Sequence, residues 1–198
     1  MSPSNLTSTL SRELSQLGIH FPPETEAKLE IFIKELVHWN RKMNLTSLGG
    51  RELARRLVAE PCWIGQQLQM SGTMLDLGSG NGSPGIPLYI GCGLRRADLV
   101  EARLKRAAFL RHVASRLGDG NIVVNRVRLE DMTTAPDVDW ITLQGVKPIE
   151  SLIQALRRLF SPTTFIVWIT SGEFSLPGTK IAVPDSKTLV RVLRLDQF

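Results

Sequence analysis

Residues 74–85 read Met74-Leu-Asp-Leu-Gly-Ser-Gly-Asn-Gly-Ser-Pro-Gly85, which is a short apolar strand followed at once by a glycine-rich loop. Gly78, Gly80 and Gly82 alternate after the strand. Glycine lets a backbone turn tightly and come close to a ligand where a Cβ would intrude. A strand, a glycine loop and a helix in succession are typical of the first unit of a ligand-binding α/β sheet. This stretch therefore predicts both the fold and the place of the site.

Downstream of the loop, apolar strands alternate with amphipathic helices. Strands are predicted at residues 74–77, 97–100, 122–124, 140–142 and 164–169, and helices at 103–117 and 149–160. This order favours a parallel sheet with right-handed crossovers. Two last strands, at 180–183 and 189–195, have only the turn residues Pro184 and Asp185 between them, which predicts an antiparallel hairpin. We expect a doubly wound, mostly parallel sheet with an antiparallel C-terminal edge.

Upstream of the loop, the pattern is helical throughout. Between residues 23 and 44, apolar side chains at i, i+3, i+4, i+7 and i+8 form one stripe of an amphipathic helix: Leu29, Phe32, Ile33, Leu36 and Val37. Shorter helices are predicted at residues 5–17, before Gly18, and at 51–59 and 61–70. We therefore expect an N-terminal helical region at residues 1–71 and a ligand-binding domain at residues 72–198.

Composition limits the class of protein. With 198 residues, of which 42% are hydrophobic and 22% charged, the chain can bury a full core in one domain. Its N-terminus has no charged leader before an apolar stretch, and no run approaches the roughly 20 apolar residues of a membrane span. These features predict a cytoplasmic protein without a membrane partner.

The cysteine and histidine pattern predicts no metal site. Cys62 and Cys92 have no CxxC spacing, and His20, His38 and His112 are scattered, so neither structural zinc nor a disulfide framework is expected. The net charge of +5 suits a polyanionic partner such as nucleic acid, but it does not identify one by itself.

The residues around the glycines narrow the choice of ligand. A nucleoside triphosphatase needs GKS or GKT at the end of the loop, and this chain has Gly82-Ser83-Pro84. A dinucleotide fingerprint fits better, because residues 80–85 do spell GxGxxG. Two residues argue against it. Asp76 could accept bonds from a ligand ammonium or its waters, and Pro84 removes an amide donor that a pyrophosphate would need.

Glu101 lies about 20 residues beyond the loop, at the end of the second predicted strand. Both oxygens of a carboxylate accept hydrogen bonds, so Glu101 could hold the two hydroxyls of a ribose. That role would serve an adenosyl cofactor and a nicotinamide dinucleotide equally. The alternative is an exposed acid that opens the next helix.

The combined motifs resemble the glucose-inhibited division protein B family, the bacterial small-subunit ribosomal RNA guanine-N7 methyltransferases. The resemblance rests on Trp39-Asn-Arg-Lys-Met-Asn-Leu-Thr-Ser47, on the extension of the glycine loop through Pro84-Gly-Ile-Pro-Leu88, and on Leu99-Val-Glu-Ala102 with Lys105-Arg106 and Phe109-Leu110. The PGIP extension and the segment that begins with Trp39 are not general methyltransferase features. The resemblance covers both halves of the chain.

The resemblance implies a Rossmann-like class I methyltransferase that is a monomer and uses S-adenosyl-L-methionine without a metal. The residues expected to contact the cofactor are Asp76, Gly78, Gly80, Gly82, Ser83, Glu101, Leu129, Glu130 and Gln144. Leu129 and Glu130 would lie at the adenine, and Gln144 beside the methyl donor. Asn40 would face the site from the helical region. For Asn40 and Asn44 the alternative is a role at the helix C-terminus, where Asn is common.

The implied acceptor is guanine N7 of ribosomal RNA, alone or in the small ribosomal subunit. N7 already carries a lone pair, so alignment and exclusion of water are needed rather than a general base. Basic residues would hold the RNA phosphates, and the candidates are Arg41, Lys42, Arg51, Arg55, Arg56, Lys105 and Arg106. The alternative for each of them is a solvated helix surface.

The chain departs from the family pattern mainly at positions that would face the substrate. Residue 83, usually Phe or Leu, is Ser83, and an Arg-Ala pair is replaced by Gln144-Gly145, which loses a bidentate cation. The Lys-His and Asp-Ser pairs of the following helix are Arg56-Leu57 and Glu60-Pro61. Two alternatives therefore stay open: a methyltransferase of the same fold with another substrate, and a cofactor-binding protein without transfer activity.

Overall fold

The computed structural model describes residues 3–118, 120–172 and 176–198. Within them the chain forms a seven-stranded sheet in the order β3-β2-β1-β4-β5-β7-β6. The strands are β1 (Thr73–Leu77), β2 (Arg96–Val100), β3 (Ile122–Asn125), β4 (Trp140–Gln144), β5 (Phe165–Thr170), β6 (Thr179–Ala182) and β7 (Leu189–Arg194). Strands β1 to β5 pair in parallel, whereas β7 runs antiparallel to both β5 and β6. The predicted parallel sheet with an antiparallel edge is confirmed.

Both faces of the sheet are buried, and alternate side chains supply the two cores. In β1, Met74 joins the core on one face, while Leu75 and Leu77 join the core on the other. In β5, Val167 and Trp168 divide in the same way. Successive side chains of a strand point to opposite faces, so a continuous apolar run is what a doubly covered sheet requires.

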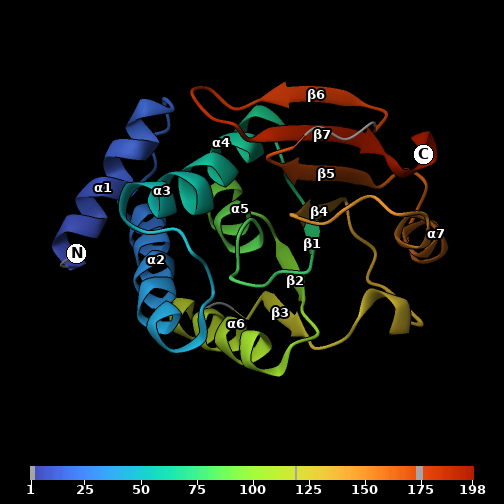
Figure 1. Ribbon diagram of the computed structural model, residues 1–198, viewed down its shortest axis with the longest axis horizontal. Coiled ribbons are helices and arrows are strands. Elements are labelled where there is room, and N and C mark those ends of the chain that lie inside the picture. The colour runs from blue at the N-terminus through green and yellow to red at the C-terminus, as the bar shows by residue number, and fades with distance from the viewer. Residues whose placement is uncertain (1–2, 119, 173–175) are drawn as a thin grey trace.

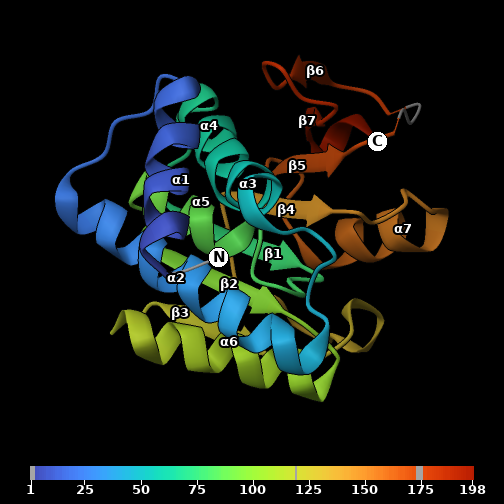
Figure 2. The same cartoon turned by 60° about the vertical axis from the view of Figure 1, so that its left-hand side comes forward.

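Helices cover the two faces unequally (Figures 1 and 2). One face carries α5 and α6 together with the N-terminal helices, and the other carries α7. The α-helices are α1 (Pro3–Gln16), α2 (Pro23–Met43), α3 (Gly50–Ala54), α4 (Glu60–Gln67), α5 (Gly85–Cys92), α6 (Leu104–Leu117) and α7 (Glu150–Leu159). Short 3-10 turns at Leu129–Asp131 and Leu195–Gln197 complete the second face.

The helices predicted at residues 51–59 and 61–70 form one run in the structure. A π-helical turn, Arg55–Ala59, joins α3 to α4, and the Glu60 amide donates to the carbonyl of Arg55, five residues earlier. Pro61, at the start of the second predicted helix, occupies the first turn of α4, where proline is tolerated.

The N-terminal helices share the core of the sheet face that they cover. Phe32 of α2 and Phe109 of α6 are both fully buried in the same cluster as Met74. At the edge of this contact, the His112 Nε2 and a Glu35 carboxylate oxygen lie 2.9 Å apart. The helical region is therefore packed directly against the helices that flank the glycine loop.

Candidate functional site

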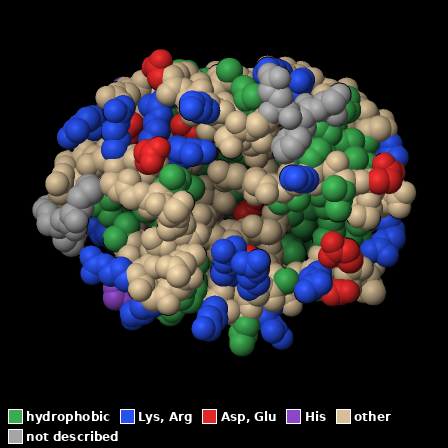
Figure 3. Space-filling model, in the orientation of Figure 1, with side chains coloured by type: hydrophobic (Ala, Val, Ile, Leu, Met, Phe, Trp, Pro, Cys, Tyr) green, Lys and Arg blue, Asp and Glu red, His purple; other side chains and the backbone are tan. Residues whose placement is uncertain are grey.

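The glycine loop occupies residues 78–84, between the C-terminal end of β1 and the start of α5. In the sheet, β1 lies between β2 and β4, so the chain leaves β1 in one direction and later returns on its other side. Open α/β sheets bind ligands outside the strand ends at such a switch point. Figure 3 shows a hollow near the centre of this view, with acidic atoms at its bottom and basic side chains beside it.

Gly78 and Gly82 both have a positive φ, of 74° and 87°, but their surroundings differ. A Cβ on Gly78 would meet only a methyl group of Val146, at 3.9 Å, so the space above this residue is open. A Cβ on Gly82 would lie 2.8 Å from Ile86 and 2.9 Å from Phe32. Gly78 thus leaves room for a ligand, whereas the missing side chain of Gly82 serves packing between the loop, α5 and α2. Contact of the Gly82 backbone with a cofactor stays a prediction.

Glu101 follows β2 and is only 6% exposed. Its Oε2 accepts a hydrogen bond from the Gly80 amide at 3.1 Å, and its Oε1 accepts one from the Arg103 amide at 2.7 Å. The carboxylate is thus fixed beside the loop, and each oxygen keeps a second lone pair for a further donor. Arg106 lies next to it, because a Cβ on Gly80 would be 3.3 Å from the Arg106 Nη1.

Asp76 lies beneath the loop and is 1% exposed. Its Oδ1 accepts a hydrogen bond from the Thr142 hydroxyl at 2.7 Å, because β1 and β4 pair with these two residues opposite each other. Its buried Oδ2 has no hydrogen-bond partner among the described residues. Burial raises the pKa of Asp76 to about 6, although the bond from Thr142 acts in the opposite direction. An unpartnered buried carboxylate oxygen can accept a bond from a cation or an ordered water.

We predict that Asp76 makes stability pH-dependent in an unusual direction. Its folded pKa lies above the ordinary value of 3.8, so its ionisation costs the folded state stability. This cost amounts to about 3 kcal/mol, is nearly complete above about pH 7, and is lost as the pH falls through 6 toward 4. Asp76→Asn keeps an oxygen for Thr142 and removes the charge.

Urea unfolding from pH 4 to 8 measures this contribution as the stability of Asp76→Asn minus that of the unsubstituted chain. The difference should increase by about 2 kcal/mol between pH 4 and 6 and level off above about pH 7. A difference that is independent of pH would contradict the raised pKa.

Ser83 and Gln144, the two departures from the family pattern in the cofactor set, meet in the structure. Ser83 is 7% exposed, and its Oγ lies 3.5 Å from the Oε1 of Gln144 at the end of β4. Gly145 and Val146 follow, and Val146 faces the open space above Gly78. The wall between the loop and the end of β4 is therefore polar and uncharged.

Leu129 and Glu130 lie in the 3-10 turn that follows β3. Leu129 is 7% exposed and belongs to the core of the second face, while Glu130 is exposed. Because β3 pairs with β2, this turn follows the strand beside the one that places Glu101. Their contact with adenine stays a prediction.

Asn40 has a structural role near the C-terminus of α2, as the alternative to a place in the site would have it. Its Nδ2 donates to the Thr46 carbonyl and its Oδ1 accepts from the Thr46 amide, both at 2.9 Å. Asn44 caps α2 in the left-handed conformation, with φ of 50°. The Asn40 amide therefore holds the segment that follows α2, and its predicted place beside a methyl donor stays a prediction.

Arg55, one of the predicted RNA-binding residues, has its guanidinium paired inside the fold. It is 12% exposed, lies 3.8 Å from a Glu13 oxygen and 3.6 Å from a Glu60 oxygen, and donates to the Pro184 carbonyl at 2.6 Å. Arg51 binds Glu13 at 2.6 Å, and Arg56 lines the same cleft as the hairpin turn at Asp185. Arg55 is thus an internal ion-pair partner, which argues against its predicted role as an RNA contact.

Other kinds of site are not seen in the described part of the chain. There, no helix is long and apolar enough to cross a membrane, and no three His, Cys, Asp or Glu side chains gather into a group that could hold a metal ion. Cys62 and Cys92 are free, and burial raises the pKa of Cys92 to about 12.

The comparisons with known proteins converge on one family. The family model GidB, described as rRNA small subunit methyltransferase G, matches residues 25–176. A protein of that name from Xylella fastidiosa is 36% identical over 123 residues, covering 62% of this chain and 58% of the relative. The chain thus matches less than two thirds of that relative's length. A protein of the same name from Coxiella burnetii is 28% identical, in a match that covers 96% of this chain and 92% of the relative.

A solved structure supports the fold. It is an RNA methyltransferase from Salinibacter ruber in complex with S-adenosyl-L-homocysteine, with a TM-score of 0.50 at 21% identity. The match covers 62% of this chain and 80% of that one. The sheet and its helices therefore have the Rossmann-like class I architecture that the sequence predicted.

Proposed function

Since the chain belongs to the family described as rRNA small subunit methyltransferase G, we propose that it transfers a methyl group from S-adenosylmethionine to guanine N7 of small-subunit (16S) ribosomal RNA. The observation that carries the proposal is the open cradle at Gly78 with the fixed Glu101 carboxylate beside it, at the switch point of the sheet. We also infer that the enzyme is cytoplasmic, where ribosomal RNA is made in bacteria, and works as a monomer.

The residues around the loop fit S-adenosylmethionine. The space above Gly78 has room for part of the cofactor, which a Cβ on this residue would exclude. The free lone pairs of Glu101 suit the two ribose hydroxyls. The unpartnered Oδ2 of Asp76 suits the ligand's ammonium, reached through a water. Leu129 and Glu130 would contact the adenine. The bound cofactor supplies an activated methyl group.

Chemistry at guanine N7 demands little from the protein beyond placement. The N7 lone pair is the nucleophile, so the site must align it with the methyl carbon and exclude water. Ser83 and Gln144 form an uncharged wall where the acceptor would enter, and neither needs to move a proton. Arg41, Lys42, Lys105 and Arg106 would hold RNA phosphates. Residues 72–198 would bind the cofactor and residues 1–71 would contribute to RNA binding.

One observation favours a second candidate, a methyltransferase of this fold with a different substrate. The two substituted family positions touch each other, which is consistent with a single adaptation of the acceptor wall. Replacing a cation by Gln144 removes a strong contact for phosphate or carboxylate. Incubation with labelled S-adenosylmethionine and either naked 16S rRNA or 30S subunits separates the candidates. Label at guanine N7 in either sample supports the first, and its absence from both favours the second.

We predict that Gln144→Arg increases methylation of ribosomal RNA about tenfold in kcat/KM, because a charge-assisted bond to RNA contributes about 1.4 kcal/mol. Initial rates on the better of the two RNA substrates measure the change. Gln66→Arg, at an exposed position of α4, adds the same charge elsewhere and serves as the matched control. Equal rates for the two variants would show that the neutral wall is already adapted to its substrate.

A further inference from the structure

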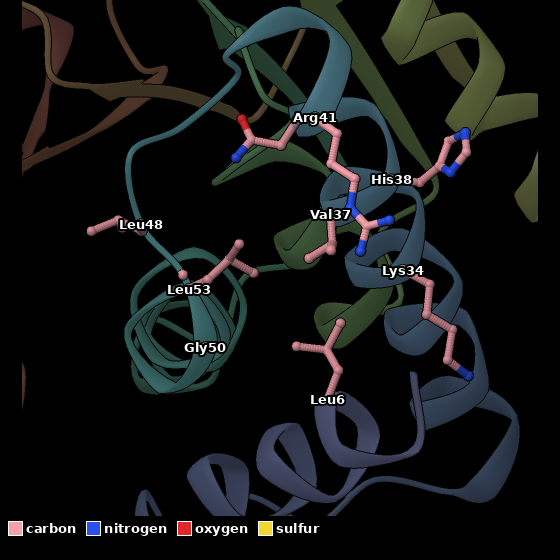
Figure 4. A pocket seen from close by; sticks show the side chains of 10 residues that line it. Leu6, Lys34, Val37, His38, Arg41, Leu48, Gly50 and Leu53 are labelled. Atoms are coloured by element: carbon pink, nitrogen blue, oxygen red, sulfur yellow. The ribbon is translucent and has the colours of Figure 1, made fainter. Parts of the chain in front are cut away.

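A separate pocket lies among the N-terminal helices. It has a volume of about 450 Å³ and is bounded by α1, α2 and the segment that leads into α3 (Figure 4). This volume is in the lower part of the roughly 300–1,000 Å³ range of small-molecule sites, which suits one nucleotide. We call it the N-terminal pocket; its lining residues are Leu6, Lys34, Val37, His38, Asn40, Arg41, Leu48, Gly49, Gly50 and Leu53.

The floor of the N-terminal pocket is apolar. Figure 4 shows Leu6, Val37 and Leu53 pointing toward its centre from three different helices. Leu6 and Leu53 are 5% and 1% exposed, so they support the floor from beneath, whereas Val37 is half-buried and forms the accessible part of it. A concave apolar surface of this kind suits the apolar face of a nucleobase.

The rim of the pocket is basic and carries no carboxylate among its lining residues. The Arg41 side chain runs along α2 toward Val37, while Lys34 and His38 point outward (Figure 4). Lys34 is paired with Glu30 at 2.8 Å, but Arg41 has no ion pair within the described residues. An exposed guanidinium beside an apolar surface is suited both to a phosphate and to stacking on a planar base.

The wall of the pocket is built before any ligand arrives. The two Asn40 bonds to Thr46 fix the segment that carries Leu48, and the Leu48 amide donates to the Thr46 hydroxyl at 3.1 Å. Preorganisation of this kind lowers the ordering cost of binding. Through its bonds to Thr46, the Asn40 side chain therefore helps to shape the N-terminal pocket.

A second cleft fits an anion less well. It lies between the helical region and the hairpin turn, and its lining mixes three carboxylates with four cations: Glu52, Glu60 and Asp185 with Arg51, Arg55, Arg56 and Lys187. The Arg55 in it is already paired with Glu60 and Glu13. Charge complementarity therefore favours the N-terminal pocket for a negatively charged ligand.

We propose that the N-terminal pocket binds one nucleotide of the RNA substrate, distinct from the nucleotide that is methylated. Its base lies on Val37, which Leu6 and Leu53 support from beneath, and its phosphate binds Arg41. This proposal rests on the proposed function for the identity of the RNA. It gives the helical region a role in substrate recognition that is separate from the cofactor loop.

The test compares Arg41→Gln and Val37→Glu with Lys28→Gln, which removes the same charge from an exposed position of α2 outside the pocket. Fluorescence anisotropy with labelled 16S rRNA fragments gives the dissociation constant at several salt concentrations. Arg41→Gln should weaken binding about tenfold and lower the salt slope by about one. Val37→Glu should weaken it further, by placing a negative charge on the floor. Thermal unfolding checks that each variant is folded.

Calorimetry with S-adenosylmethionine should give equal affinities in all three variants and the unsubstituted chain. RNA binding by the two pocket variants that equals that of Lys28→Gln overturns the proposal, even where the chain methylates RNA. Binding of free guanosine monophosphate that depends on Arg41, with RNA affinity unchanged, also overturns it. Arg41-dependent RNA binding without methyl transfer supports the pocket and refutes the proposed function.

Discussion

Gly78→Val should lower the affinity for S-adenosylmethionine by more than a hundredfold. Gly78 has φ of 74°, and the space above it is open to within 3.9 Å of Val146. A valine there fills that space and strains a backbone conformation that β-branched residues rarely adopt. Isothermal titration calorimetry measures the change.

Strain alone must be separated from loss of the ligand's space, and Gly93 offers the control. Gly93 also has a positive φ, of 61°, with nothing within 4 Å of its Cβ position, and it ends α5 away from the loop. Gly93→Val should therefore lose comparable stability but keep its cofactor affinity. Full affinity in Gly78→Val would mean that the loop is structural only.

Glu101→Ala should weaken cofactor binding about a hundredfold. The substitution removes the acceptors proposed for the ribose and also the bond that holds the Gly80 amide at 3.1 Å. Two lost bonds to a charged group, at roughly 1.5 kcal/mol each, correspond to that factor. Glu101→Gln keeps one acceptor oxygen, so its cofactor affinity should lie between that of Glu101→Ala and that of the unsubstituted chain.

The matched control for Glu101 is Glu24→Ala, which removes an exposed carboxylate from the start of α2. Its affinity should equal that of the unsubstituted chain. Equal affinity of Glu101→Ala would show that Glu101 only opens α6, which is the alternative that the sequence left open.

The strands and the long helices could be predicted because their patterns are local. The alternation of apolar runs predicts the parallel strands, and the stripe of α2 predicts its buried face at Leu29 and Phe32. Helix α5 has no such stripe, since apolar residues surround it on all sides and it is buried. The insertion of β7 between β5 and β6 also has no local signal, because it depends on which strand edge is free.

The parts of the site that were missed depend on contacts between distant residues. The partner of Asp76, Thr142, follows from the register of β1 against β4, which a single sequence does not reveal. Arg55 looked like a surface cation, but its partners include Pro184, 129 residues away. Asn40 pairs with Thr46, only six residues away. The turn between them depends on the left-handed cap at Asn44, and the sequence leaves a role at the helix C-terminus open as an alternative for both residues.

The structure also clarifies the choice between cofactors that GxGxxG alone left open. Asp76 is buried beneath the loop, and its Oδ2 has no hydrogen-bond partner among the described residues, so a negatively charged pyrophosphate would approach an unpaired carboxylate oxygen. Pro84 lies at the N-terminus of α5, where it offers no amide to a phosphate. Both features favour a ligand that brings positive charge to the loop.

Calorimetric titration of the unsubstituted chain with S-adenosylmethionine, and separately with NAD, tests the central claim most directly. We expect micromolar binding of S-adenosylmethionine, one molecule per chain, and no heat of binding with NAD. Binding of NAD, with none of S-adenosylmethionine at millimolar concentration, would contradict the account.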